Sequence, residues 1–332
     1  MQKIKRNSPQ PQAEKRVPLQ NTVPATGLEP VRGCPRGILS PLRLPIPPCR
    51  QTKPFTAANT TYANEQWMEV DANHRSNLQP VSYTHLRKIR NTYYFIYSSQ
   101  WQHELCYATS SSPNSNFTFG GVIISNGDIG FQGRSAKERV AMTGNNHGSM
   151  ELINGEWYIF YHRQTHKTSF SRQGCAEKIS ILQDGSIPQV EMTSCGLNNG
   201  PLAVSGRYNA TIACNLTNGN MPHVEQTPLE DTVPYITHQA DEHFITDITN
   251  GTIIGYKYFK FTGPTVLNLC IRGDAVGYFE LFTDEEMLGS VSVRTEKEWE
   301  MSSVSISAVG VHALFLKYHG EGMVQLKEIV FS

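Results

Sequence analysis

The sequence has few charged residues and no excess of either sign. Charged side chains make up 17% of its 332 residues, and 29 basic residues stand against 29 acidic ones. A chain without net charge lacks the strong positive field that attracts nucleic acid or an anionic membrane surface. We therefore expect neither of these as its main partner.

Long apolar runs are also missing. The sequence contains no run of about 18 apolar residues, so it predicts no membrane-spanning helix. The basic residues near the N-terminus are not followed by an apolar segment, and on this basis no secretory signal is expected. The sequence leaves the localisation and the oligomeric state open.

The cysteines follow neither a disulfide framework nor a zinc-binding pattern. There are seven of them, at irregular spacing and without a C-x-x-C pair, which is typical of buried thiols. His162 and His166 have the spacing of metal ligands. Since no third ligand lies nearby in the sequence, we expect no zinc site there.

Proline and composition divide the chain into four segments. Eleven of the 19 prolines lie before residue 55, and residues 1–80 are basic and show no sustained period, which predicts a disordered or non-native segment. Residues 81–214 alternate short strand-like runs with turns. Residues 215–234 are polar and turn-rich and predict a linker. Residues 235–332 hold about seven short apolar-alternating runs, which predict a sandwich or jelly roll.

The runs expected as strands are defined by aromatic and β-branched residues between turn signals. In the first block they are Tyr93–Tyr97, His103–Ala108, Val122–Ser125, Met150–Ile153, Trp157–Tyr161, Ala176–Leu182 and Gln189–Met192. In the second block they are Gly255–Phe261, Thr265–Ile271, Gly277–Thr283, Gly289–Val293, Trp299–Ile306, Gly310–Tyr318 and Met323–Phe331.

Two near-copies recur in the first block. The segment NTYYFIYSSQ begins at Asn91 and GEWYIFYHRQ begins at Gly155, an offset of 64 residues (155 − 91). Each copy leaves a turn and enters an aromatic strand. Repeated β units of this kind are typical of propellers and solenoids.

The order of motifs around the second copy resembles glycoside hydrolase family 43, the five-bladed β-propeller xylosidases and arabinofuranosidases. It consists of GNNHGS at Gly144–Ser149, the G-x-W-Y-x-F-Y-H strand that ends at His162, and Ser171-Arg172. The C-terminal block resembles a family 6 carbohydrate-binding module, on Glu298-Trp299 and on the segment GVHALFLKY that begins at Gly310.

This resemblance implies an all-β protein, with a partial five-bladed β-propeller followed by a β-sandwich. It also implies a glycosidase that hydrolyses β-xylosidic or α-L-arabinofuranosidic linkages, with plant cell-wall oligo- or polysaccharide as the partner. Many members of the family are secreted or periplasmic bacterial proteins.

The resemblance further assigns residues of the substrate site. His147 is expected to point into the axial channel and to support a central cation, calcium, through water. Arg172 and Trp157 are expected to contact the substrate. The alternatives from the residues themselves are a hydrogen-bonded turn histidine for His147 and a surface arginine for Arg172.

The expected sugar platforms of the second block are aromatic. Tyr256, Tyr258, Phe259 and Trp299 are candidates, because an exposed aromatic face stacks on the apolar face of a pyranose. The alternative is that these side chains belong to the core, and we favour this for Trp299.

The catalytic carboxylates are not found. The resemblance implies an inverting enzyme whose catalytic acid is a glutamate a few residues ahead of Arg87. Residues 80–86, however, contain no acidic side chain. Asp128 is most simply a turn residue, and either Glu151 or Glu177 could face the channel.

The first block is also too short for a complete ring. Five blades need roughly 300 residues and only about 150 are available, so we expect an incomplete propeller whose first blades are missing or replaced by unrelated sequence. Activity is then expected to be weak or absent. The alternative is a non-catalytic carbohydrate-binding protein.

Overall fold

The computed structural model describes residues 82–100, 102–168, 170–224 and 232–332, all within one compact unit, Thr52–Ser332. The expected segment 1–80 lies outside the described residues. The described chain is all-β, and its helices are three short 3₁₀ turns. These turns are η2 (Phe131–Gly133), η3 (Ala136–Glu138) and η4 (Ala210–Ile212).

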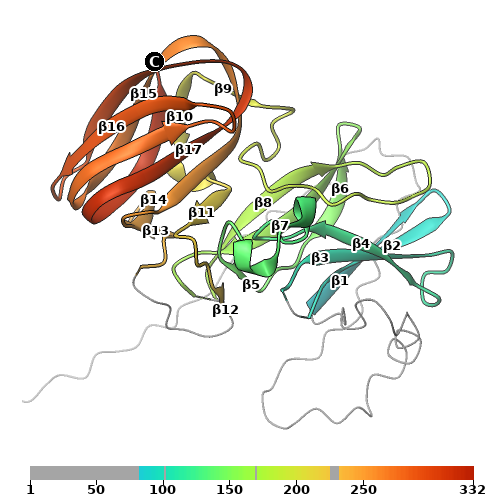
Figure 1. The fold of residues 1–332 in the computed structure, drawn as a ribbon. Helices are drawn as coiled ribbons and strands as arrows, with labels where there is room; N and C mark the ends of the chain where they lie inside the picture. Colours follow the sequence, from blue (N-terminus) through green and yellow to red (C-terminus); the bar gives the residue numbers. More distant parts are fainter. Residues whose placement is uncertain (1–81, 101, 169, 225–231) are drawn as a thin grey trace, which may run out of the picture. The chain divides into compact units, whose positions relative to one another are not determined.

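A four-stranded antiparallel sheet opens the described chain (Figure 1). Its strands, in spatial and chain order, are β1 (Ser82–Ile89), β2 (Thr92–Ser98), β3 (Leu105–Ser110) and β4 (Thr118–Ile124). The β1–β2 turn is tight, and Arg90 adopts a φ of 54° in it. Aromatic and β-branched residues make up most of β2, as strand propensity requires.

A three-stranded antiparallel sheet follows. It consists of β6 (Ser149–Ile153), β7 (Glu156–Gln164) and β8 (Arg172–Ile179) in that order. Asn154 and Gly155 join β6 to β7 with φ of 52° and 83°, the backbone of a two-residue hairpin turn. The two sequence copies therefore form β2 and β7, each the second strand of a tight hairpin.

One expected strand of the first block does not form. Residues 189–192 have no ladder partner. Instead, the Val190 amide donates to Ile123 O and the Met192 amide donates to Asp128 Oδ1 at 2.8 Å. These contacts hold the segment along the end of β4, so its apolar alternation reflects packing rather than sheet pairing. A short parallel pair, β5 (Thr143–Gly144) with β12 (His223–Val224), completes this half.

The remaining strands form one eight-stranded sheet that folds back on itself. Its members are β9 (Leu202–Ala203), β10 (Gly206–Asn209), β11 (Asn215–Thr217), β13 (Tyr235–Gln239), β14 (Glu242–Ile248), β15 (Ile253–Phe282), β16 (Met287–Thr295) and β17 (Glu300–Phe331). The long strands β15 and β17 pair with each other over most of their length, and Leu267 pairs with both Val304 and Phe331. The expected runs of this block are thus merged into strands that bend.

Strand pairing places residues 202–217 differently from the expected division. β9 pairs with β15, β10 with β17 and β11 with β15. These short strands follow the first block in sequence but belong to the large sheet. The start of the expected linker 215–234 is therefore sheet rather than connection.

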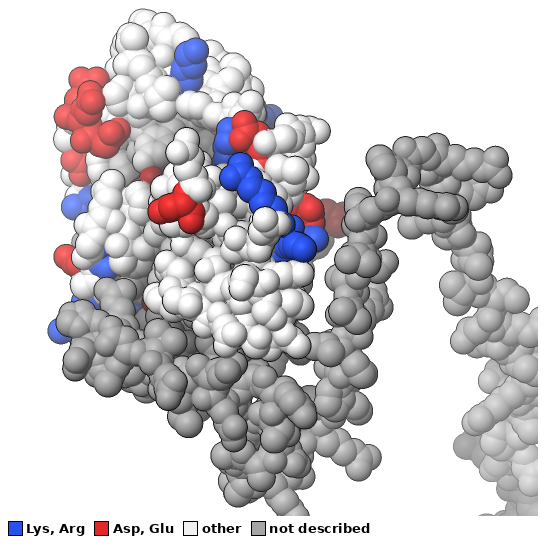
Figure 2. Space-filling view, turned by 90° about the vertical axis from the view of Figure 1, so that its right-hand side faces the viewer, with Lys and Arg blue, Asp and Glu red and all other residues white. Residues whose placement is uncertain are grey.

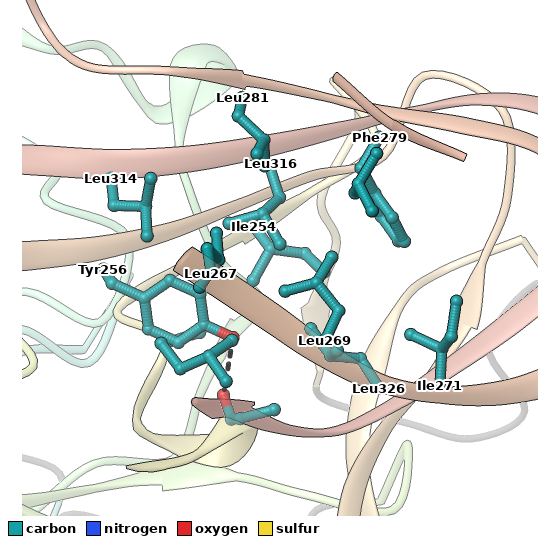
Figure 3. Packing of buried hydrophobic residues seen from close by; sticks show 14 of the residues in the cluster. Ile254, Tyr256, Leu267, Leu269, Ile271, Phe279, Leu281, Leu314, Leu316 and Leu326 are labelled. Atoms are coloured by element: carbon teal, nitrogen blue, oxygen red, sulfur yellow. Dashed lines mark hydrogen bonds between the residues drawn. The ribbon is translucent and has the colours of Figure 1, made fainter. Parts of the chain in front are cut away.

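The inner faces of the large sheet enclose the main hydrophobic core. Figure 3 shows Leu267, Leu269 and Ile271 alternating along β15 toward Leu316 and Leu326 of β17, all fully buried. This period of two is the pattern of a strand with one buried face. A second cluster around Tyr94, Ile96, Leu105, Met150 and Ile159 joins the two smaller sheets.

A buried ion cluster connects the first block to the large sheet. The Lys257 ammonium on β15 lies 2.6 Å from Glu191 Oε1 and 3.5 Å from Asp128 Oδ2, and its side chain is only 6% exposed. The Tyr258 hydroxyl donates to the other Glu191 oxygen at 2.6 Å. Three distant segments are thereby held by one cation.

Removing this cation is expected to destabilise the protein strongly. In Lys257→Met the Asp128 and Glu191 carboxylates stay in place without a counter-charge, and we expect the free energy of unfolding to fall by about 3–5 kcal/mol. Lys260→Met, on the exposed side of the same strand, is the control and should change it by less than about 0.5 kcal/mol. Urea unfolding followed by circular dichroism measures both, and equal stabilities of the two variants would contradict the assignment.

Candidate functional site

His147 and His162 form the centre of a polar cluster beside β7. His162 Nε2 lies 2.8 Å from His147 Nδ1, and the two rings meet edge to face at 83°. The Asn146 side chain accepts a hydrogen bond from the His162 amide at 3.2 Å, and Asn126 donates to the His162 carbonyl at 3.0 Å. The backbone of His162 is therefore held on both sides.

Glycine at position 148 makes this arrangement possible. A Cβ added to Gly148 would lie 1.8 Å from the Phe160 carbonyl oxygen, so any side chain would separate the two segments. The close approach places His147 against His162 across the start of β6. This explains the need for glycine in the HGS motif in physical terms.

Burial and neighbouring cations keep the cluster uncharged. The pKa of His162 is lowered to about 4, mainly by burial and to a smaller extent by the charges of His147 and Arg172. Burial, then Arg172 and His85, lowers the pKa of His147, and burial and Arg87 lower that of His85. At neutral pH the cluster thus offers neutral imidazoles near the guanidinium groups of Arg172 and Arg87, and these side chains can donate hydrogen bonds to hydroxyls or accept them.

The structure brings together part of the expected substrate site. Arg172 begins β8, whose residue Gly174 pairs with His162, and the charge of Arg172 acts on both His147 and His162. Trp157 lies five residues before His162, about 16 Å along the strand, and packs against the hydrophobic cluster. Trp157 is therefore not grouped with the histidines.

Two members of the cluster were not assigned to it from sequence. In the sequence, His162 ends the G-x-W-Y-x-F-Y-H motif and has a metal-ligand spacing from His166, whereas no pattern marks His85. Its contact with the Gly148 backbone bridges 63 positions (148 − 85), which no local pattern shows. The YHRQ ending of the repeat was the one signal for His162.

The described cluster does not match the ligand preference of calcium. Calcium binds oxygen ligands, mainly carboxylates, carbonyls and water. The described side chains around His147 are imidazoles and the Arg172 guanidinium, whose positive charge repels a cation. We derive no role for calcium from these residues.

Three other described residues have potential ligand atoms close together. Oxygens of Asp284 and Glu285 and a ring nitrogen of His312 lie within 4.8 Å of one another. Both carboxylates are exposed, and Asp284 already accepts from the Ala313 amide and contacts His312. Their protein contacts account for their positions.

Two buried carboxylates have the raised pKa of a catalytic acid, but not its accessibility. Burial raises the pKa of Glu177 to about 7 and that of Asp128 to about 6. Glu177 is only 4% exposed and accepts hydrogen bonds from Tyr161 and Thr193, while Asp128 is 0% exposed beside Lys257. Both carboxylates are structural, and neither lies open to a substrate.

Glu151 has another partner. Its carboxylate forms an ion pair with Arg87, whose Nε also donates to the Met150 carbonyl at 3.1 Å. This pair connects β1 to β6 at the surface. Of the carboxylates considered from sequence, none contacts the histidine cluster within the described residues.

Three of the aromatic platforms expected in the large sheet are not exposed. Tyr256 is 0% exposed, and Figure 3 shows its ring among Leu267 and Leu314, with its hydroxyl donating to the Ala210 carbonyl at 3.2 Å. Phe259 is also fully buried. Tyr258 is partly buried, with its hydroxyl on Glu191. The parity of β15 turns Tyr256 inward, so a sugar cannot reach it.

Trp299 is the expected aromatic residue that stays at the surface. It is half-buried just before β17, and its indole N–H donates to Glu242 Oε2 at 2.9 Å. The Arg272 guanidinium carbon lies 4.2 Å from the ring centroid and the Lys327 ammonium 4.8 Å, and Phe244 meets the ring edge. Trp299 is therefore not a core residue but the centre of a polar surface group.

The described surface has no dominant charge on the face that Figure 2 shows. Most of that face is uncharged, and basic side chains lie beside acidic ones rather than in one basic patch. Among the residues that the structure describes, no helix is long and apolar enough to cross a membrane.

Comparison with known proteins gives two curated relatives. A xylosidase/arabinosidase of Thermoclostridium stercorarium is 46% identical over 254 residues, which cover 73% of this chain and 54% of the relative. An arabinoxylan arabinofuranohydrolase of Paenibacillus polymyxa is 25% identical over 236 residues, which cover 66% of this chain and 34% of the relative. The chain thus spans about half the length of the first relative and a third of the second. No protein-family model matches it.

Solved structures give partial matches. A glycoside hydrolase family 43 arabinoxylan arabinofuranohydrolase from Bacillus subtilis, in complex with cellotetraose, matches with a TM-score of 0.41 and 23% identity, over 75% of this chain and 53% of that chain. A family 6 carbohydrate-binding module from Clostridium stercorarium, in complex with cellobiose, matches with a TM-score of 0.32 and 17% identity. The match covers 40% of this chain and 98% of that module.

The fold and the sequence identity together define the class, an all-β relative of glycosidases. More particularly, the chain is a relative of the family 43 xylosidases and arabinosidases. The partial structural matches reported above include a family 43 enzyme and a family 6 carbohydrate-binding module.

The raised pKa of Glu177 has a measurable consequence. The pKa of Glu177 is about 7 in the folded protein, rather than the ordinary 4.5. As pH rises, this carboxyl therefore ionises in the unfolded chain before it ionises in the folded one. The free energy of unfolding consequently falls as pH rises from about 4.5 to 7. Glu177→Gln cannot ionise, and its amide can donate to Thr193 Oγ1. The free energy of unfolding of the variant minus that of the wild type should therefore increase by about 2–3 kcal/mol from pH 5 to pH 8. Urea unfolding at both pH values tests this, and a difference that does not change with pH would refute it.

Proposed function

We propose that this chain is a carbohydrate-active protein that binds plant xylan- or arabinan-type polysaccharide through a partial family 43 propeller and a family 6-like sandwich. The observation that carries the proposal is the 46% identity over 254 residues to a xylosidase/arabinosidase. A shared fold does not by itself establish an activity, which depends on particular site residues.

The arrangement of the smaller sheets supports the propeller assignment. Each contains a tight hairpin whose second strand is one copy of the 64-residue repeat, and Arg87 of β1 contacts Met150 and Glu151 of β6. Neighbouring blades of a propeller pack in this way around an axis. The sheets β1–β4 and β6–β8 are then two blades of an incomplete ring.

The histidine cluster is suited to a neutral, hydroxyl-rich ligand. His147 and His162 are uncharged at neutral pH, and Arg172 is exposed at the start of β8. Neutral imidazoles and a guanidinium can hydrogen-bond several sugar hydroxyls without a counter-ion. We assign the substrate-contacting part of the site to these three residues.

Hydrolysis by this chain is proposed to be weak or absent. Glycoside hydrolysis needs a carboxylic acid and a carboxylate on opposite sides of the scissile bond. Among the described carboxylates, Glu151 is paired with Arg87, and Asp128 and Glu177, the two with raised pKa, are buried. The proposed activity is therefore glycan binding, and hydrolysis of xylosidic or arabinofuranosidic linkages is the second candidate.

Turnover assays separate these two functions. We expect the purified chain to release no nitrophenol above background from aryl β-xylosides or aryl α-L-arabinofuranosides at pH 5 to 8. A matched sample carrying Arg172→Ala corrects for a contaminating glycosidase. If the wild-type chain hydrolyses these substrates and Arg172→Ala does not, the chain is a hydrolase and not only a glycan-binding protein.

Binding to neutral arabinoxylan tests the histidine–arginine site. Loss of hydrogen bonds from a charged group should make Arg172→Ala bind about tenfold more weakly. Lys178→Ala is the matched control, because Lys178 is an exposed base on the same strand, paired at the surface with Glu156. Affinity electrophoresis compares the two variants. If arabinoxylan retards both variants equally, the histidine–arginine cluster is not the binding site.

A further inference from the structure

The surface group around Trp299 contains an arginine whose protein partners are neutral. Arg272 Nε donates to Gln325 Oε1 at 2.6 Å, and its Nη2 donates to Gln239 Oε1 at 3.0 Å. The Gln325 amide in turn donates to Thr246 Oγ1 at 3.1 Å. Two glutamine side chains therefore position the guanidinium without neutralising it.

Aromatic rings fix the plane of the same guanidinium. Its central carbon lies 4.2 Å from the Trp299 centroid and 5.1 Å from that of Phe244. Gly273 lets the strands approach closely here, since a Cβ at this position would lie 2.1 Å from the Met323 carbonyl oxygen. Arg272 is thus held in one orientation before any ligand binds, which lowers the entropy cost of recognition.

The nearby acidic side chain already has a cation of its own. Glu242 lies 2.9 Å from the Lys327 ammonium and also accepts from the Trp299 indole. These hydrogen bonds, with the charges of Lys327 and Arg272, lower the pKa of Glu242, so it is ionised and paired at neutral pH. Lys327 and Glu242 cancel, and the charge of Arg272 has no ion-pair partner among the described residues.

The guanidinium keeps N–H donors that no described residue uses. Nη1 has no acceptor among the residues that the structure describes, and Nη2 uses one of its two N–H groups. These adjacent donors form the fork that binds a carboxylate through two parallel hydrogen bonds. A neutral sugar, in contrast, finds the Trp299 face partly covered by this cation.

We propose that Arg272, presented by Trp299, Gln239 and Gln325, binds the carboxylate of a uronic acid in a plant polysaccharide. This rests on the proposed function only in taking the ligand to be a plant glycan. The same carboxylate chemistry occurs on xylan branches and in the galacturonan main chain. The carboxylate group is what Arg272 recognises in either case.

The test compares one polysaccharide with and without its carboxylates. Affinity electrophoresis of the full chain uses glucuronoxylan, the same glucuronoxylan after chemical reduction of its carboxyl groups, and polygalacturonate. We expect the native glucuronoxylan to bind about tenfold more tightly than the reduced form at low salt, because charge-assisted hydrogen bonds are lost on reduction. The difference should shrink in about 0.5 M NaCl, since the site is at the surface. The polygalacturonate arm identifies the source of the uronate.

Matched variants assign the effect to the guanidinium fork. Arg272→Gln should remove the preference for the unreduced polymer, and Arg272→Lys, which keeps the charge without the fork, should retain only part of it. Arg294→Gln, an exposed arginine on β16 of the same sheet, should leave the preference unchanged. If Arg272→Gln does not fold, judged by circular dichroism, Arg272→Lys and the reduction experiment on the wild-type chain still decide.

The outcomes separate this proposal from the proposed function. Equal binding of native and reduced glucuronoxylan by the wild-type chain overturns the uronate site and leaves glycan binding intact. A preference that Arg294→Gln removes as fully as Arg272→Gln assigns it to general surface charge and also overturns the site. If none of the polysaccharides, neutral or acidic, binds the wild-type chain, the proposed function itself fails.

Discussion

The structure depends on the pairing of β15 with β17, which organises everything after residue 200. Both strands bend and pair with each other on either side of the bend, so their apolar residues meet inside one folded-back sheet. The short strands β9, β10 and β11 attach to this framework although the chain reaches them directly from the first block. Burial of the inner face, at about 25 cal/mol per Å², is the driving term.

Buried charged side chains connect this sheet to the first block of the chain. Lys257 extends from β15 to Asp128 and Glu191, and Arg163 on β7 donates to the carbonyls of Ala213 and Thr211. A buried charge is costly unless partners surround it, so loss of one partner of these contacts destabilises the fold. Because β7 also carries His162, the histidine cluster is supported by the same contacts.

The two candidate glycan contacts use different chemistry. The His147–His162 pair with Arg172 is neutral apart from one guanidinium and is suited to hydroxyls. The Trp299 group places Arg272 over an aromatic ring and between two amides, which is suited to a carboxylate. A relative of xylosidases and arabinosidases would in this way contact both the neutral backbone and the acidic branches of a cell-wall polymer.

The sequence by itself determined the all-β class, most of the strands, the repeat and the relationship to glycosidases, because strand period, turn residues and the HGS motif are local signals. Through that relationship it also predicted His147 and Arg172 as residues of a substrate site. Only the tertiary structure decided that Tyr256 faces inward, that Trp299 stays at the surface, and that His85, His162 and Arg272 join their groups. The physical reason is that burial and pairing depend on residues far apart in the chain, such as Lys257 and Asp128, and local pattern carries no information about which distant partner meets them.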